Sequence, residues 1–265
     1  MNWTPNWSAG VANPKISVVT CSYNHVRFLE RTIRSVLDQE YPNLEYIVID
    51  GGSADGSVEI LRRYSDRLSY WVSEPDQGQT HALTKGFERA TGEVLCWLCS
   101  DDLHEPSTLH EVGRFFTENP DAQIVYGDST WIDAEDRIIA PKKEHRFNRF
   151  IWMYDHNFIP QPSTFWRRDL YRQVGGLDKT FDIAMDADLW MRFAEITKIH
   201  HVPRPWSRMR FYPEQKVRTL LQRGRQEDRR VRERYLGKKS EWAYRVLYIC
   251  AKTMRVAWKV ATHRY

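Results

Sequence analysis

Short apolar runs alternate with longer amphipathic stretches from the N-terminal region up to Asp102. The runs lie at residues 15–21, 44–50, 68–73 and 94–99. Runs of this length that are bounded by turn-forming or polar residues are typical of strands buried on both faces of a parallel sheet. The stretches between them, such as 26–39, place apolar residues at helical spacing. This alternation predicts an α/β fold with a mostly parallel, Rossmann-like central sheet flanked by helices.

The alternation weakens after Asp102, where shorter elements follow. Residues 124–126 and 130–132 are apolar enough for short strands, and 137–140 can pair with them as a hairpin. We therefore expect a small antiparallel part beside the parallel sheet. The expected organisation is an N-terminal extension (1–14), one domain (15–212) with halves 15–102 and 103–212, and a basic helical C-terminal extension (213–265).

The composition fits one large domain. The chain has 265 residues, a hydrophobic content of 42% and a formal net charge of +4. Eleven tryptophans favour a protein that handles flat or sugar-like ligands, although tryptophan also fills cores. The cysteines lack the spacing of a secreted disulfide framework, and we expect Cys96 and Cys99, inside an apolar strand, to be core thiols. Because no signal peptide and no apolar stretch of about 18 residues is visible, we expect a cytoplasmic location.

Two adjacent carboxylates, Asp101 and Asp102, follow the apolar run at 94–99. Ligands of open α/β sheets bind outside the carboxyl ends of the strands. Mg²⁺ and Mn²⁺ prefer oxygen ligands and often link carboxylates to substrate phosphates. The same pair can also begin a turn that caps the next helix. From these two residues alone, both interpretations stay open.

Both common glycine-rich phosphate-binding loops, GxGxxG after the first strand and GxxxxGK[ST], are missing from the sequence. A nucleotide bound at this sheet edge would need another positive group beside its phosphates, and a metal on Asp102 would supply it. Asp186 begins a stretch at 186–194 with helical apolar spacing. It can cap that helix or face a cleft.

Four motifs stand in order between about residues 15 and 194. They read SVVTCSYNH, YIVIDGGSADGS, AxxKGFERATGEVLCWLCSDD, and GGLD followed by AMDADLWMRFA. Together they resemble the motifs of family 2 glycosyltransferases with the GT-A fold. The resemblance implies transfer of a sugar from a nucleotide-diphosphate donor, a UDP-sugar first of all, to an acceptor hydroxyl. It also implies inversion and a divalent metal, Mn²⁺ or Mg²⁺.

The resemblance gives the acidic residues distinct roles. Asp102 would be the metal ligand that bridges the diphosphate, and Asp101 would lie near the donor ribose or sugar, with Ser100 completing the SDD motif. Asp186 would be the general base that takes the proton of the acceptor hydroxyl. Trp190, one turn further along the helix, would line the acceptor pocket.

The nucleobase contacts implied by the resemblance come from the first two motifs. Tyr23 would stack on the base, the Cys21 region would contact it through the backbone, and Asp50 would accept its N–H. Two departures concern the phosphates. The family often has an arginine where this chain reads ALT at 82–84, so phosphate contact would pass to Gln79, His81 or Lys85, or to the metal alone.

The second departure lies after the catalytic helix. The family often has an RxH motif there, whereas this chain reads RFY at 210–212. The change puts a third metal ligand in doubt and leaves Arg210 as a candidate for the diphosphate. The chemistry nevertheless fits one base and one metal, because a single displacement inverts the anomeric centre. Retention would need a further nucleophile, and Asp188 should point away from Asp186 on a helix.

Two other functions remain as alternatives. One is a nucleotidyltransferase, although SYNHVR is not the glycine- and arginine-rich loop such enzymes carry after the first strand. The other is a nucleotide-sugar-binding protein without turnover. Residues 241–263 predict a basic amphipathic helix that can contact the inner face of the cell membrane or pack on the domain. The acceptor would be a saccharide or a lipid-linked molecule, and membrane contact would suit a lipid-linked one, as in assembly of cell-surface polysaccharide or glycan. Nothing indicates nucleic-acid binding.

Overall fold

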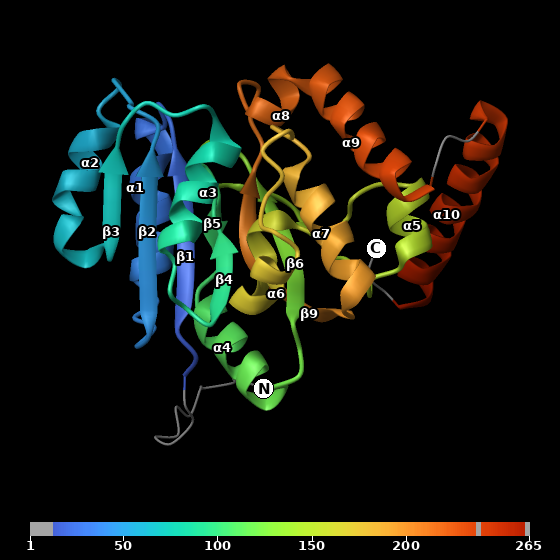
Figure 1. Ribbon diagram of the computed structural model, residues 1–265, viewed down its shortest axis with the longest axis horizontal. Coiled ribbons are helices and arrows are strands. Elements are labelled where there is room, and N and C mark those ends of the chain that lie inside the picture. The colour runs from blue at the N-terminus through green and yellow to red at the C-terminus, as the bar shows by residue number, and fades with distance from the viewer. Residues whose placement is uncertain (1–12, 237–239, 263–265) are drawn as a thin grey trace.

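The computed structural model describes residues 13–236 and 240–262, which form one sheet with helices around it and a helical C-terminal region (Figure 1). Most of the predicted extension at 1–14, and the last residue of the predicted helix at 241–263, lie outside the described residues. The sheet has the strand order β3-β2-β1-β4-β8-β6-β9-β5, and β7 pairs with β6 at its side. The α/β architecture with a mostly parallel part is therefore confirmed.

The parallel part contains the four strands expected from the apolar runs. Its strands are β1 (Ile16–Ser22), β2 (Leu44–Asp50), β3 (Tyr70–Ser73) and β4 (Val94–Trp97). The helices between them are α1 (Val26–Leu37), α2 (Ser57–Arg63) and α3 (Gln79–Arg89), with a 3₁₀ turn at Ser65–Arg67. Gly86 lets α3 lie close to the sheet, since a Cβ there would stand 2.3 Å from Cγ1 of Val19.

The second part of the sheet contains strands of both directions. Its strands are β5 (Leu103–His104), β6 (Ile124–Ile132), β7 (Ile138–Lys142), β8 (Thr164–Arg167) and β9 (Ile199–Arg210). β8 runs antiparallel to β4 and β6, while β6 and β9 are parallel. The predicted hairpin of 137–140 is confirmed. The two short strands expected at 124–126 and 130–132 are one strand, because Gly127 and Asp128 stay paired with β9.

The helices of this part are shorter, and the C-terminal helices follow them. They are α4 (Thr108–Glu118), α5 (Arg149–Tyr154), α6 (Arg168–Gln173), α7 (Met185–Ile196), α8 (Lys216–Thr219), α9 (Leu221–Leu236) and α10 (Glu241–Ala261), with a 3₁₀ turn at Gln161–Ser163. In Figure 1, α9 lies beside α7, and α10 lies beside α5. An ion pair between Arg255 and Asp155 fastens α10 there. The C-terminal segment therefore packs on the domain.

A buried aromatic cluster joins the two parts of the sheet. The rings of Trp97 on β4 and Trp190 on α7 are stacked, with centroids 5.6 Å apart and planes 15° apart. Trp166 on β8 contacts both rings edge-on. Edge-on and offset contacts of this kind stabilise aromatic pairs by about 0.5–1.5 kcal/mol beyond the area they bury. The cluster fixes where α7 begins relative to the end of β4.

Candidate active site

A cavity of about 810 Å³ opens at the carboxyl ends of β1 and β4. Its size suits a small-molecule ligand with several polar groups. Seven residues proposed from the sequence line it together: Cys21, Tyr23, Gln79, Ser100, Asp101, Asp102 and Asp186. The structure thus brings residues from both sequence halves to one place. Other lining residues, including Asp76 from a loop and Lys216 from the start of α8, come from segments to which the motifs gave no role.

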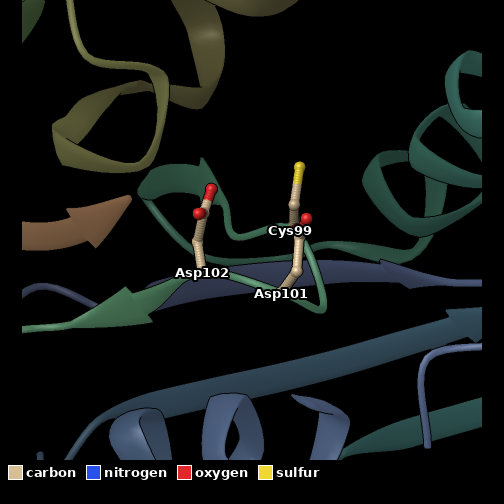
Figure 2. A group of neighbouring side chains, drawn as sticks. All are labelled: Cys99, Asp101 and Asp102. Carbon is tan, nitrogen blue, oxygen red and sulfur yellow. The ribbon is translucent and has the colours of Figure 1, made fainter. Parts of the chain in front are cut away.

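The two adjacent carboxylates stand on the turn between β4 and β5. Figure 2 shows the side chains of Cys99, Asp101 and Asp102 rising from one side of this turn. The buried hydroxyl of Thr32 lies 2.9 Å from the backbone carbonyl oxygen of Ser100 and 2.8 Å from that of Asp102, and its single proton is shared between them. The turn is therefore held from below by α1.

Hydrogen bonds also fix the carboxylate groups themselves. Oδ1 of Asp102 accepts the backbone N–H of Arg210 at 2.9 Å, and Oδ2 of Asp101 accepts the hydroxyl of Tyr212 at 2.9 Å. Among the described residues, neither carboxylate forms an ion pair with Lys or Arg. Burial, and then the charge of Asp101, raises the pKa of Asp102 well above its ordinary range. A cation beside it would favour the charged form.

These residues fit a divalent cation. The thiol of Cys99 and the carboxylates of Asp101 and Asp102 offer ligand atoms that all lie within 4.8 Å of one another. Carboxylate oxygens suit Mg²⁺ and Mn²⁺. Cys99 was expected in the core, but it is only half-buried and lines the cavity, with its sulfur 3.2 Å from Nε2 of Gln79.

A second corner of the cavity is formed by Tyr23, Gly51 and Asp76. A Cβ on Gly51 would lie 2.8 Å from Oδ2 of Asp76 and 3.3 Å from Cδ2 of Tyr23, so both side chains lie directly against that glycine. The ring of Tyr23 is 62% exposed and therefore free to stack on a planar ligand. The arrangement suits a flat heterocycle.

Asp50 does not line the cavity, contrary to the sequence-based prediction. It is fully buried, and its carboxylate accepts four hydrogen bonds: from the N–H groups of Gly52 and Ser53 and from the hydroxyls of Ser53 and Ser73. These donors occupy both oxygens. Asp50 therefore shapes the turn that presents Gly51 instead of reaching the ligand itself.

Asp186 lies on the opposite wall, in the first turn of α7. Its Oδ2 accepts Nδ2 of Asn157 at 3.0 Å. The amide of Asn157 can face only one way, because its own oxygen accepts the N–H groups of Trp152 (3.1 Å) and Ile159 (3.2 Å). Burial raises the pKa of Asp186 to about 6, while the hydrogen bonds from Ala187 and Asn157 lower it in part. A carboxylate of this pKa is suited to take a proton near neutral pH.

The loop in front of α7 is held by Glu227 of α9. One oxygen of this buried carboxylate accepts the N–H groups of Asp182 (3.0 Å), Ile183 (2.7 Å) and Ala184 (3.0 Å). Burial alone raises the pKa of Glu227, but these backbone hydrogen bonds outweigh it and the pKa lies below its ordinary range. The C-terminal region thereby sets the position of Asp186.

Comparison with known proteins identifies the family of this chain. The sequence model of the family described as "Glycosyl transferase family 2" matches residues 17–175, which is more than half of the chain. The chain belongs to glycosyltransferase family 2. An uncharacterized glycosyltransferase of Mycobacterium tuberculosis (strain ATCC 25618 / H37Rv) is 32% identical over 192 residues, which cover 68% of this chain and 69% of that protein. An uncharacterized glycosyltransferase of Rickettsia typhi is 26% identical over 216 residues, covering 79% and 68%.

Solved structures of glycosyltransferases share the GT-A fold of this chain. S. aureus TarS in complex with UDP-GlcNAc superposes with a TM-score of 0.63 at 18% identity, covering 76% of this chain and 60% of that one. The mannosyltransferase PcManGT from Pyrobaculum calidifontis, in complex with GDP-Man and Mn²⁺, superposes with a TM-score of 0.63 at 17% identity, covering 94% and 76%. The predicted family and fold are both confirmed.

Three residues that the family pattern suggested lie away from the cavity. Trp190 is fully buried in the aromatic cluster and does not line an acceptor pocket. Lys85 pairs with Glu74 at 2.8 Å beside a separate depression. The side chain of Arg210 is fully buried, and it donates to the carbonyls of Asp101 and Asp133 (both 2.7 Å). Arg210 therefore supports the carboxylate turn from behind.

Four residues around the glycosyltransferase site had received no role from the sequence: Asp76, Asn157, Lys216 and Glu227. Asp76 had a usable signal, because it follows a strand and precedes a helix at the same sheet edge as Asp50. The other three reach the site through packing of distant segments. Among them, Glu227 sits in a run of α9 rich in charged residues, where a buried carboxylate looks like any surface residue.

Proposed function

We propose that this family 2 glycosyltransferase moves a sugar from a nucleoside-diphosphate donor to an acceptor hydroxyl with inversion, assisted by a divalent cation. The observation that carries the proposal is that Asp101 and Asp102 line one cavity with Asp186. The first two suit a cation and the third suits a general base. The ligands named for TarS (UDP-GlcNAc) and PcManGT (GDP-Man with Mn²⁺) support a nucleotide-sugar donor.

The donor would lie along the sheet edge. The nucleobase of the donor would fit the corner of Tyr23, Gly51 and Asp76, with the backbone of Cys21 beside it. Asp102 would hold the cation, with Asp101 and Cys99 next to it. When bound, Mn²⁺ or Mg²⁺ neutralises charge on the diphosphate and makes the nucleotide a better leaving group.

Asp186 would accept the proton of the acceptor hydroxyl. Its carboxylate is positioned by Asn157 and lines the same cavity. The next acidic residue on α7, Asp188, is fully buried and paired with Arg192 and Arg234, so it is not a second nucleophile. One base without a covalent partner supports a single displacement, which inverts the anomeric carbon.

A thermal-shift screen tests donor binding first. UDP-, GDP- and dTDP-sugars are added with and without Mn²⁺, and stabilisation by one nucleotide that depends on metal supports the proposal. Transfer is then measured by mass spectrometry on saccharide and lipid-linked acceptors. Donor binding without transfer or hydrolysis would support the binding-protein alternative. Release of pyrophosphate from a nucleoside triphosphate would instead support a nucleotidyltransferase.

We also propose that α10 rests on an anionic lipid surface, which would place the site near a lipid-linked acceptor of glycan assembly. Among the described residues, no helix is both long and apolar enough to span a bilayer. Yet Trp242 (75% exposed), Val246, Ile249 and Val260 form one apolar stripe along α10, since their spacing puts them on one helix face. Exposed Arg245 and Lys252 flank the stripe, as in interfacial helices.

Vesicle co-sedimentation tests this surface. Wild-type protein should pellet with vesicles containing phosphatidylserine and less with neutral phosphatidylcholine vesicles. Trp242→Glu combined with Ile249→Glu should remain in the supernatant. If the double variant pellets as well as the wild type, another surface contacts lipid. If the wild type does not pellet with either kind of vesicle, no surface does.

A further inference from the structure

The charge of the cavity is strongly one-sided. Among the described residues that line it, six carry carboxylates: Asp76, Asp101, Asp102, Asp182, Asp186 and Glu214. The lining contains a single Lys or Arg within the described part of the chain, and this is Lys216. A nucleoside diphosphate brings further negative charge, and one divalent cation cannot balance all of it. A fixed protein cation beside the diphosphate is therefore expected to be important for binding.

Lys216 comes from the start of α8, beyond the residues 17–175 that match the family. Its Nζ contacts Oδ1 of Asp182 at 2.7 Å, the carbonyl oxygen of Asp182 at 3.0 Å and Oε1 of Gln79 at 3.2 Å. The amide nitrogen of the same Gln79 contacts Cys99 beside the carboxylate turn. Lys216 is thereby connected through one side chain to the place where the cation would bind.

Asp182, the ion-pair partner of Lys216, has a second cation beside it. Asp182 also pairs with Arg223 of α9 at 3.2 Å, so its charge stays compensated when Lys216 turns away. The Lys216 side chain is 36% exposed, and its four-carbon stem allows the ammonium group to move between acceptors. Arg223 is not among the residues that line the cavity. Of these two cations, Lys216 is thus the one that faces a ligand.

We infer that Lys216 binds the diphosphate of the donor, exchanging Asp182 for a phosphate oxygen and taking the role of the arginine that is absent at 82–84. The inference rests on the proposed function, since it needs a nucleoside-diphosphate donor. It assigns the phosphate contact to the C-terminal region instead of Lys85 or Arg210. The segment carrying Lys216 then becomes part of the donor site, although the sequence suggested a separate extension.

Isothermal titration of nucleoside diphosphates with Mn²⁺ tests the assignment. UDP, GDP and dTDP are the probes, and the corresponding monophosphate serves as comparison. Lys216→Met should weaken diphosphate binding by about 10- to 100-fold, with a smaller effect on the monophosphate. Lys216→Arg should retain most of the affinity. Lys198→Met, which removes the same charge from an exposed position away from the cavity, is the matched control.

Asp182→Asn separates phosphate binding from a structural role. If Lys216 acts on phosphate, releasing it from Asp182 leaves diphosphate affinity equal to wild type or higher. If the Lys216–Asp182 pair only holds the loop, both variants lose affinity alike and the inference is overturned. Unchanged binding by Lys216→Met also overturns it, while wild-type binding stands. Failure of the wild type to bind any of the three diphosphates removes the proposed function itself.

Discussion

The two walls of the cavity are built in different ways. Asp101 and Asp102 follow directly after the end of β4. Hydrogen bonds from α1, from β9 and from Tyr212 hold their turn and their carboxylates. Asp186 depends on Asn157 from one loop and on Glu227 from α9, a helix later in the chain. The wall of Asp101 and Asp102, which is proposed to bind the metal (the metal wall), is thus a product of sheet topology. The wall of Asp186, the proposed general base (the base wall), is a product of long-range packing. Substitutions should therefore affect the two walls separately.

Asp186→Asn should have the largest effect. Loss of a general base should reduce kcat by about 10²–10⁴-fold, while Mn²⁺-dependent nucleotide binding stays within a fewfold of wild type. Initial-rate kinetics and calorimetry measure the two quantities. A parallel loss of donor binding would show that the walls are not separate.

The same substitution should stabilise the fold near neutral pH. The pKa of Asp186 in the folded protein, about 6, lies above its ordinary value of 3.8. A raised pKa contributes stability that is fully present below about pH 4 and is lost as the pH rises through about 6. Above that, the buried charge costs roughly 1–3 kcal/mol, which asparagine avoids. A lower Tm for Asp186→Asn at pH 8 would contradict this account.

Asp102→Asn should rank second. We expect a loss of about 10²–10³-fold in transfer, because the charge that holds the cation is removed. Unlike the change at Asp186, it should also abolish the Mn²⁺ dependence of nucleotide binding. Exposed Asp121→Asn removes an equal charge elsewhere and serves as control. Metal-dependent binding by Asp102→Asn equal to that of wild type would exclude the assigned role.

The pH dependence of kcat/KM should reveal the pKa of Asp186. The proposed base Asp186 would act in its ionised form, and its pKa is about 6, so kcat/KM should rise with pH and level off above that value. One unit below it, the rate should fall by about tenfold. A pH–rate profile with saturating metal checks this, and an acidic limb centred near 4 would be evidence against burial of the base.

Glu227→Ala should act on catalysis from a distance. It leaves three backbone N–H groups without their acceptor, so we expect a loss of about 2–3 kcal/mol in stability and roughly tenfold in kcat. Donor affinity should change little. Glu233→Ala, on the same helix and more exposed, is the matched control. Equal effects of the two variants would mean that Glu227 does not position Asp186.

Asn157→Ala should be the smallest change and the most diagnostic. Its hydrogen bond lowers the pKa of Asp186, so its removal should move the acidic limb upward by up to about one unit. Rates well above the limb should stay within a fewfold of wild type. Exposed Asn119→Ala provides the reference. If kcat falls equally at every pH, Asn157 only supports the loop.

The sequence was sufficient to predict the position of Asp101 and Asp102, which local patterns determine. The apolar run at 94–99 and the alternation before it indicated where Asp101 and Asp102 leave the sheet, and Asp186 was recognised at its helix start. The motifs also carried the family. For Asp101 and Asp102, strand direction decides position, and strand direction can be read from hydrophobic periodicity.

The errors share a physical cause, which is that periodicity says nothing about partners. Trp190 and Arg210 follow the family pattern, but the aromatic cluster and the carbonyls of Asp101 and Asp133 bury them. Asp50 satisfies its hydrogen bonds with its own turn. Lys216 and Glu227 looked like members of a basic extension, since only the contacts of α8 and α9 with residues 182–184 bring them to the site.

Thr32 helps to fix the turn that carries Asp101 and Asp102 before any ligand binds. Its hydroxyl ties two carbonyls of the turn that carries the carboxylates. Ordering a free backbone costs about 1–2 kcal/mol per residue, so a turn of this kind that was disordered before binding would lower ligand affinity by a large factor. Here the conformational entropy is already lost when the ligand arrives. Binding of cation and donor can then be limited by release of their water, instead of by rearrangement of the chain.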